Sequence, residues 1–408
     1  MKLKPIINSL LETDLYKFSM GQTIAHQFNR DKTNWAFKCR NKDVVFTPEM
    51  VQEIKGQIDH FCTLRFKRDE LEWLGKALPW LSEDYIANLR QWQPERSEIF
   101  VNDPTNAVVD GCGLTIEARG RWVDTSMYEI PILAIVNEVY FAFTYGEGAL
   151  DIDFKTRARK KLQALKDGEY ELGVFSEFGL RRRYSGAMQD WLINLMVAHN
   201  VPGFVGTSNV FLAKKYGIKP VGTMAHEFIQ TVGQAHHEHN PAYSNHYMLK
   251  AWVKEYGVQN GIALTDTIGT DVFLRDFNLT YATLFSGVRH DSGDPIAWGE
   301  KMLAHYQKLG IDPRTKTLLF SDSLDFEKAT HIYRYFKNKA KVAFGIGTWL
   351  SADVGQPALN IVFKVIEANG SPVSKLSDVE GKQMCRDKEY ISYLRRCIDW
   401  RLTHEKEN

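Results

Sequence analysis

Seven short apolar segments in the second half of the chain, each ending in small or polar residues, constrain the fold most strongly. They begin at Val174, Phe204, Pro220, Ile262, Leu284, Thr317 and Val342, and helical patterns such as 295–309 and 325–338 separate them. Parallel strands that are buried on both faces have continuous apolar sequences and need helical crossovers. The pattern predicts a closed or nearly closed β/α barrel over residues 135–358, with an open doubly wound sheet as the alternative.

The two ends of the chain are predicted to form a different kind of unit. Residues 1–134 are typical of an α+β layer, with helices expected at 14–28 and 48–61 and strands at 33–40, 98–100, 107–109 and 114–121. In the tail, 359–364 and 371–376 are expected to be paired strands, joined by a turn at Ala368-Asn-Gly-Ser371. We expect the tail, 359–408, to fold back onto the amino-terminal layer and complete it.

Composition excludes several classes of protein. Hydrophobic residues make up 44% and charged residues 25% of the 408 residues, which is the ordinary balance of a globular protein. The 51 basic and 50 acidic residues leave a net charge of +1, which argues against a nucleic-acid binder, although it allows a local basic site.

Membrane insertion and secretion are not expected. The apolar stretch 130–143 is interrupted by Asn137 and Glu138 and is too short to span a bilayer, and no apolar leader opens the sequence. The five cysteines form no CxxC pair, so neither a zinc site nor a disulfide framework is indicated. A reducing, cytoplasmic location fits best.

Polar side chains follow the predicted barrel strands, where a β/α barrel carries its active site. Arginines, carboxylates and glycine-rich turns would share one rim, which favours a pocket for a phosphorylated, metal-bound ligand. The residues are Glu177, Arg181, Arg182, Arg183, Thr207, Ser208, Thr223, His226, Glu227, Asp266, Arg289, His290, Asp291, Ser292, Gly293, Asp294, Ser321, Asp322, Gly345, Gly347 and Thr348.

Two of these turns have the chemistry of anion and cation binding. In Phe344-Gly-Ile-Gly-Thr348, glycines would let backbone N–H groups approach an anion, and a tight turn into a helix is the alternative. In Arg289-His-Asp-Ser-Gly-Asp294, the arginine suits phosphate or carboxylate, and Asp291 and Asp294 suit ribose hydroxyls or Mg²⁺. A solvated turn is the alternative there. The chain lacks GxxxxGK[ST], so a nucleotide P-loop is not indicated.

A histidine follows the third predicted strand, in Gly222-Thr-Met-Ala-His-Glu227. His226 could act as a base or nucleophile if Glu227 or Asp266 accepted a hydrogen bond from its second nitrogen. A structural histidine is the alternative.

Two further features are interpreted as structural. The histidine-rich segment 236–246 lacks HExxH spacing, so a solvated segment is favoured over a metal site. Tyr16 could stack on an aromatic ligand, but a helix capped by Thr13 with Tyr16 in the core is favoured by the residues alone.

The motifs together resemble one known family. In order they are TDLYKFSMGQ, FSEFGLRRR, GTSNVFLA, GTMAHEF, IALTDT, GVRHDSGDP, LLFSDSLD and FGIGTWL. Along essentially its whole length the chain is similar to the bacterial nicotinate phosphoribosyltransferases, which are type II phosphoribosyltransferases. The resemblance implies an irregular β/α barrel with an α+β layer, and a homodimer with shared active sites.

The resemblance also implies an activity. The family joins nicotinate to the ribose of phosphoribosyl pyrophosphate (PRPP), giving nicotinate mononucleotide and pyrophosphate, as the first step of NAD salvage from nicotinic acid. ATP hydrolysis is coupled through a phosphohistidine, which places the enzyme in the ligase class, and Mg²⁺ is expected to enter with the substrate phosphates. A related enzyme using nicotinamide or quinolinate, or a silent metabolite sensor, is the alternative.

Roles carried over from the family are predictions for this chain. His226 resembles the phosphorylated histidine, and we predict it as catalytic together with Asp266 and Asp291. Tyr16 resembles an aromatic residue that reaches the nicotinate ring from the partner subunit, and Arg181 and Arg182 resemble groups facing the nicotinate carboxylate and the PRPP phosphates. The other predicted substrate-binding residues are Glu177, Thr207, Ser208, Arg289, Ser321, Asp322, Gly345, Gly347 and Thr348.

Overall fold

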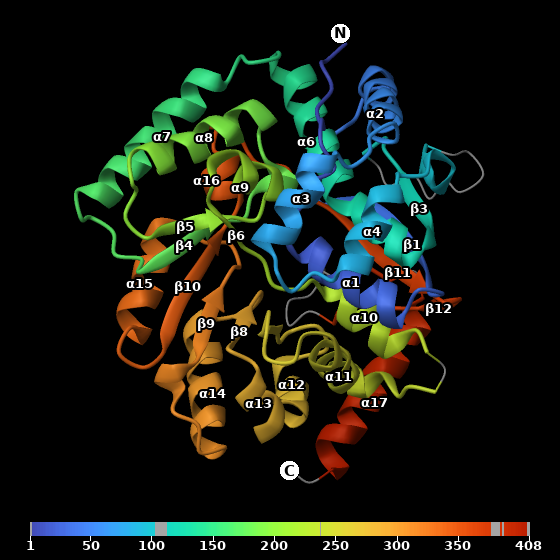
Figure 1. Ribbon diagram of the computed structural model, residues 1–408, viewed down its shortest axis with the longest axis vertical. Coiled ribbons are helices and arrows are strands. Elements are labelled where there is room, and N and C mark those ends of the chain that lie inside the picture. Colours follow the sequence, from blue (N-terminus) through green and yellow to red (C-terminus); the bar gives the residue numbers. More distant parts are fainter. Residues whose placement is uncertain (1, 103–111, 237, 377–383, 386, 406–408) are drawn as a thin grey trace.

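The computed structural model describes residues 2–102, 112–236, 238–376, 384–385 and 387–405. Seven parallel strands form one sheet in the order β6-β5-β4-β10-β9-β8-β7 (Figure 1). Their bounds are Val174–Glu177 (β4), Phe204–Thr207 (β5), Lys219–Pro220 (β6), Ile262–Leu264 (β7), Gly287–His290 (β8), Thr317–Phe320 (β9) and Lys341–Ile346 (β10). The expected irregular barrel is confirmed.

The parallel sheet is a half-barrel rather than a closed one. β10 pairs with β4, which joins the last strand to the first. Among the described residues, the edge strands β6 and β7 are not paired with each other. The strand expected from Leu284 begins only at Gly287 (β8). The helix α13 (Leu279–Leu284) ends at the residue where that apolar segment starts.

Helices pack around the parallel sheet, as Figure 1 shows for α7, α8, α14 and α15. Asp294 accepts a hydrogen bond from the Ala297 amide and so caps α14, whose predicted position is confirmed. The bounds are Asp151–Lys166 (α7), Gly186–Ala198 (α8), Val210–Tyr216 (α9), Ser244–Tyr256 (α11), Thr270–Asp276 (α12), Pro295–Lys308 (α14), Phe326–Phe336 (α15) and Thr348–Ser351 (α16).

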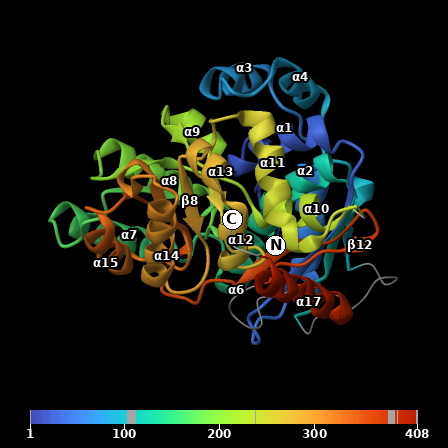
Figure 2. The same ribbon diagram turned by 90° about the horizontal axis from the view of Figure 1, so that it is seen from below.

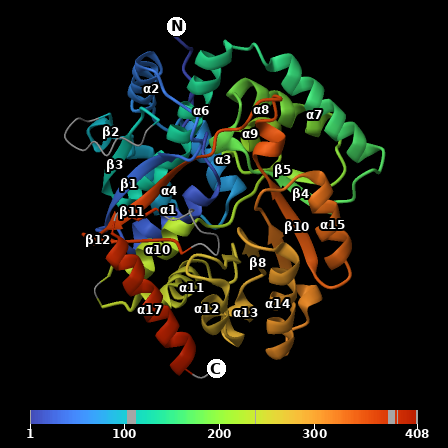
Figure 3. The ribbon, with the colours of Figure 1, turned by 180° about the vertical axis from the view of Figure 1, so that it is seen from behind.

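The second sheet is antiparallel and joins the two ends of the chain (Figure 3). Its order is β12-β11-β1-β3-β2, with bounds Ser371–Pro372 (β12), Ile361–Ala368 (β11), Lys32–Cys39 (β1), Ile116–Arg121 (β3) and Ile99–Val101 (β2). Asn369 and Gly370 have φ of 51° and 79°, as a two-residue hairpin turn requires. β11 also pairs with β1, so the return of the tail to the amino-terminal layer is confirmed. The strand expected at 107–109 lies outside the described residues.

Helices of this layer are α1 (Tyr16–Gln27), α2 (Pro48–Phe61), α3 (Arg68–Ala77), α4 (Glu83–Gln91), α5 (Trp122–Thr125), α6 (Glu129–Tyr145), α10 (His226–Gln234) and α17 (Lys388–His404). Figure 2 shows α3 and α4 at one edge of the molecule and α17 at the opposite edge. The sequence analysis did not predict α17.

Buried α6 accounts for the apolar stretch noted in the sequence. Most of its residues are buried among neighbouring elements, and no helix within the described residues is long and apolar enough to cross a membrane. The expected boundary between residues 134 and 135 falls inside this helix. The division into two units stays a prediction.

Candidate active site

His226 lies at the open side of the half-barrel, as the first residue of α10. Its Nε2 is 2.9 Å from Asp291 Oδ2 and 3.8 Å from Asp266 Oδ1, and its Nδ1 is 2.9 Å from Thr267 Oγ1. Asp266 and Thr267 follow β7, and Asp291 follows β8, so residues from two strand ends meet at one imidazole. The nearer carboxylate, Asp291, is placed to orient the ring.

Lys375, which the sequence analysis missed, also reaches this imidazole. Its Nζ is 2.9 Å from His226 Nε2 and 2.8 Å from Asp266 Oδ2. Gln234, the last residue of α10, holds the preceding Ser374 through hydrogen bonds of 2.8 and 3.0 Å to its backbone N–H and carbonyl. One helix thus positions the histidine at its start and the lysine at its end.

Arg289 fixes Asp291 from the other side. Its Nη2 is 2.7 Å from Asp291 Oδ1, and its Nε donates to Ser321 Oγ over 2.8 Å. Nη1 donates to Thr223 Oγ1 and to the Met224 carbonyl, both at 3.0 Å. The guanidinium therefore ties the ends of β8 and β9 to the segment that leads into His226.

The charges of this cluster favour a neutral imidazole beside an ionised carboxylate. Burial, reinforced by Lys375, lowers the pKa of His226 below its ordinary value. Burial opposes ionisation of Asp291, but Arg289 and the contact with His226 outweigh it and hold the pKa of Asp291 well below the usual range. A neutral imidazole has a lone pair, so His226 is suited to act as a nucleophile near pH 7.

The same cluster fits poorly as a protein cage for Mg²⁺. His226, Asp266 and Asp291 bring one ligand atom each within 4.8 Å of one another. However, Lys375 Nζ pairs with Asp266 and Arg289 pairs with Asp291, so cations already neutralise both carboxylates. Mg²⁺ also prefers a set made of oxygens. Its expected entry with the substrate phosphates stays a prediction.

A second group of side chains is basic. Arg182 Nε donates to the Ile361 carbonyl over 2.9 Å, and burial, then Arg181 and Arg40, lower the pKa of Arg182 to about 9. Burial, then Arg40, Lys375 and Arg181, lower the pKa of Lys364 to about 7. Among the described residues, neither Arg182 nor Lys364 is within ion-pair distance of a carboxylate. Because these cations repel one another, an anion that binds between them relieves the repulsion and is favoured.

The basic group faces the histidine cluster. Asp291 interacts electrostatically with Arg181, Arg182 and Lys364. Arg181 and Arg182 were predicted from the sequence, whereas Arg40 and Lys364 were not. A lysine in the otherwise apolar sequence Ile361-Val-Phe-Lys-Val-Ile366 was an available signal, because a strand core rarely includes an unpaired cation.

Binding of sulfate to this group is expected to weaken as pH rises from about 6 to 8, because Lys364, with its pKa lowered to about 7, loses its proton in that range. Sulfate keeps its charge over this pH range, so a change in affinity reports on the protein. The loss of one proton by Lys364 can weaken sulfate binding by at most about tenfold. Isothermal titration calorimetry measures it. Lys364→Met should bind sulfate weakly at both pH values, and a pH-independent wild-type affinity would contradict this titration.

Tyr16 is half-buried at the start of α1 and interacts electrostatically with Arg181. The favoured capping by Thr13 is wrong, because Leu15 precedes α1 and Thr13 Oγ1 is buried without a hydrogen-bond partner. Burial, reinforced by Glu129 and Asp14, raises the pKa of Tyr16 well above its ordinary value. The ring therefore stays an uncharged phenol.

Glu177 and Thr207, at the ends of β4 and β5, lie in a buried network. The Glu177 carboxylate accepts hydrogen bonds from the Gly179 amide at 2.6 Å, Thr207 Oγ1 at 2.7 Å and Gln189 Nε2 at 3.0 Å. The backbone of Ser208 links Glu177 to Leu15, just before Tyr16. This network supports the turn before Arg181 and Arg182, and its predicted contact with substrate stays a prediction.

The remaining predicted residues lie at or just after the ends of β9 and β10. Ser321 hydrogen-bonds Asp291 at 3.1 Å, and Asp322 is half-buried beside it. A Cβ on Gly345 would lie 2.2 Å from the Phe178 ring, and one on Gly347 would lie 3.1 Å from the Phe178 carbonyl oxygen. Packing against Phe178 thus accounts for both glycines. Anion binding there, and at Thr348, stays a prediction.

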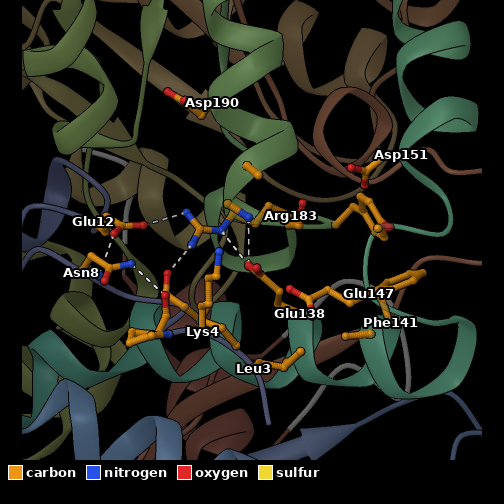
Figure 4. Close-up of a pocket in the computed structure, with 18 of the residues that line it drawn as sticks. Leu3, Lys4, Asn8, Glu12, Glu138, Phe141, Glu147, Asp151, Arg183 and Asp190 are labelled. Carbon is orange, nitrogen blue, oxygen red and sulfur yellow. Dashed lines mark hydrogen bonds and ion pairs between the residues drawn. The ribbon is translucent and has the colours of Figure 1, made fainter. Parts of the chain in front are cut away.

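Arg183 points away from this site into a separate cavity of about 480 Å³ (Figure 4). Its guanidinium is buried, 3.0 Å from Glu12 Oε2 and 3.7 Å from Glu138 Oε2. Nη2 also donates to the Ile6 carbonyl. The third arginine of the motif therefore anchors the amino-terminal segment.

The histidine-rich segment is not solvated as expected. His236 is half-buried and 3.1 Å from Asp31, and its ring centroid is 5.9 Å from that of Phe28. His239 stacks on Tyr247 with centroids 3.6 Å apart. Aromatic packing offsets the polarity of these side chains. Among the described residues, no potential metal-binding group includes either histidine.

Comparison with known proteins decides the family. Residues 174–401 match the nicotinate phosphoribosyltransferase (NAPRTase) family, and residues 11–137 match the NAPRTase N-terminal domain. The chain belongs to the nicotinate phosphoribosyltransferase family. It is an enzyme of that family, and the resemblance inferred from the motifs is confirmed.

Individual members of the family align over nearly the whole chain. The nicotinate phosphoribosyltransferase of Neisseria meningitidis serogroup B is 44% identical over 401 residues, covering 97% of this chain and 98% of the relative. That of Herminiimonas arsenicoxydans is 43% identical, covering 96% and 98%. The crystal structure of nicotinate phosphoribosyltransferase from Porphyromonas gingivalis superposes with a TM-score of 0.88 at 34% identity, covering 97% and 100%.

Proposed function

We propose that the enzyme transfers the 5-phosphoribosyl group of PRPP to nicotinate, giving nicotinate mononucleotide and pyrophosphate, with ATP hydrolysis coupled through phosphorylated His226. The observation that carries the proposal is the group of mutually repelling cations beside a neutral, oriented histidine. Incubation with nicotinate, PRPP, ATP and Mg²⁺, followed by chromatography for the mononucleotide and pyrophosphate, tests it. The reaction would open NAD salvage from nicotinic acid in the cytoplasm.

Transfer builds positive charge at C1 of the ribose while negative charge builds on the leaving pyrophosphate. In this proposal Arg182, Lys364 and Lys375 stabilise that leaving group, which their mutual repulsion supports. Mg²⁺ entering with PRPP would neutralise further phosphate charge when bound. The basic side chains therefore hold the pyrophosphate while the pyridine nitrogen of nicotinate approaches C1.

Selection of the acid over the amide is assigned to the arginines. A guanidinium forms a charge-assisted pair with a carboxylate, which nicotinate has and nicotinamide lacks. The side chain of Arg181 is 42% exposed, whereas that of Arg183 is 1% exposed, so Arg181 is the one that a ligand can reach. Arg181 also neighbours Tyr16, whose ring could stack on the pyridine. Quinolinate carries a second carboxylate, and competition among the three acceptors separates the alternatives. A homodimer with shared active sites stays part of this proposal, although Tyr16 and Arg181 are neighbours within one chain.

Replacing Arg181 or Arg182 by alanine is expected to raise the KM for nicotinate more than that for PRPP in at least one variant. Loss of a charge-assisted hydrogen bond corresponds to about a 10- to 150-fold change. Steady-state kinetics with each substrate varied in turn measure the two constants. Arg334→Ala, which changes an exposed arginine of α15 paired with Glu171, is the control. Small, equal effects on both substrates would refute the carboxylate role.

A phosphoryl group on His226 would stay bound to the protein after ATP is cleaved. The phosphoryl group would add about −1.5 to −2 charges at the first turn of α10, where backbone N–H groups and the helix dipole favour an anion. We infer that the new charge draws Lys375 and Arg289 from their present partners and reorganises the loops after Thr223 and Arg289. PRPP would then bind more tightly until hydrolysis of the phosphohistidine loosens the site.

A further inference from the structure

A buried group of three charges lies behind the active site. Lys17 Nζ is fully buried, 2.8 Å from Glu129 Oε2 and 2.6 Å from Glu227 Oε2. Ser126 Oγ donates a hydrogen bond to the other oxygen of Glu227. We call Lys17, Glu129 and Glu227 the buried triad.

Each member of the triad is attached to a different part of the active site. Lys17 follows Tyr16 in α1, and Glu227 follows His226 in α10. Glu129, at the start of α6, uses its second oxygen, Oε1, which is 3.7 Å from Arg181 Nη1. Three elements far apart in sequence are thus joined at one ammonium group.

Stability alone does not account for this arrangement. Taking three charges out of water costs about as much as their attraction returns, and an apolar replacement is often equally stable. The triad has two carboxylates for one ammonium, and Arg181 brings a second positive charge to Glu129. Glu129 is therefore shared between a buried cation, Lys17, and a cation of the ligand pocket.

This sharing gives the triad two possible arrangements. When Arg181 is held by Glu129, Lys17 divides its hydrogen bonds between the two carboxylates. When a ligand carboxylate draws Arg181 away, Glu129 interacts with Lys17 alone. The attraction between Lys17 and Glu227 then changes, and with it the position of the first turn of α10. Binding at one end then alters the position of His226 at the other, and the coupling is reciprocal.

We propose that Lys17, Glu129 and Glu227 are positioning residues that couple the pocket end formed by Tyr16 and Arg181 to His226. The proposal rests on the proposed function, because it takes nicotinate as the ligand of Arg181 and ATP as the phosphate donor to His226. It goes further in predicting that each subsite responds to changes made at the other.

Two substitutions test the coupling through crossed effects. Glu227→Gln, next to the histidine, should raise the KM for nicotinate by roughly fivefold or more, and Glu129→Gln, next to Arg181, should slow labelling of the protein by γ-phosphate-labelled ATP by a similar factor. Ser126→Ala removes only one hydrogen bond to Glu227 and should raise the nicotinate KM in the same direction by less. Steady-state kinetics and the rate of label retention give the two readouts.

A matched buried ion pair separates coupling from loss of stability. Arg401 and Asp276 are 2.6 Å apart and at most 5% exposed, and they lie outside the site. Arg401→Met should lower the melting temperature without changing either readout. The proposal is overturned if the effects of Glu227→Gln and Glu129→Gln, and of the mild Ser126→Ala, stay confined to the adjacent subsite. Absence of mononucleotide formation by the wild-type enzyme would instead refute the proposed function.

Discussion

Alanine in place of His226 is expected to abolish ATP hydrolysis and the retention of phosphate by the protein, while slow, uncoupled transfer persists. The imidazole is the group held between Asp291, Thr267 and Lys375, and no other described side chain occupies that position. Removing an activated nucleophile costs on the order of 10³-fold or more in its own step. Release of inorganic phosphate and of pyrophosphate, measured in parallel, gives the two rates.

Two further variants define what the histidine contributes. His226→Asn keeps a hydrogen-bonding group near Asp291 but cannot form a phosphohistidine, so it should behave like the alanine variant. His331→Ala, at an exposed histidine of α15, should leave both rates unchanged. Mass spectrometry of the ATP-treated wild type should find an acid-labile phosphate on the peptide 219–228. ATP hydrolysis that stays in step with product formation in His226→Ala would contradict the assignment.

Asp291→Asn is expected to lower the rate of His226 phosphorylation by about 10²- to 10⁴-fold, although the side chain keeps its shape. The amide cannot serve Nε2 of His226 as an ionised acceptor, and it leaves Arg289 without the carboxylate 2.7 Å away. The imidazole is therefore less firmly oriented, and Arg289 is less firmly held beside it. Single-turnover labelling with γ-phosphate-labelled ATP measures the loss.

The pH profile gives Asp291→Asn a second signature. Asp291 acts to raise the pKa of His226, against the lowering by burial and by Lys375. Without that carboxylate the pKa of His226 falls further, so the acidic limb of the labelling rate should move to lower pH. Ser321→Ala, which removes a neutral partner of Arg289 and Asp291, should reduce the rate far less and leave the limb in place. An unshifted limb in Asp291→Asn would show that Asp291 does not act through His226.

The barrel strands were predictable because burial on two faces leaves a continuous apolar sequence. Each strand end then placed its polar residues at one rim, so His226, Asp266 and Asp291 were found by position alone. The strand expected at Pro220 is present as β6 (Lys219–Pro220), but its shortness and the gap beside it were not predictable. Pairing between edge strands depends on tertiary packing, which leaves no local pattern in the sequence.

The missed residues share a different cause. Lys375, Lys364 and Arg40 lie on the antiparallel layer, far in sequence from the barrel residues that they neighbour. Local periodicity contains no information about which distant segments become neighbours. Glu177 shows a related limit, because its position at a strand end was predictable but the hydrogen bond that its carboxylate accepts from Thr207 was not.

The pairing of β1 with β11 affects the order in which the basic residues of the site are synthesised. Arg40 leaves the exit tunnel early, but its strand neighbour, with Lys364 and Lys375, is synthesised after all seven parallel strands. A nascent chain stopped at residue 358 would hold the histidine and its carboxylates without the ammonium groups of Lys364 and Lys375. The group of cations proposed to bind pyrophosphate would therefore be completed last during synthesis.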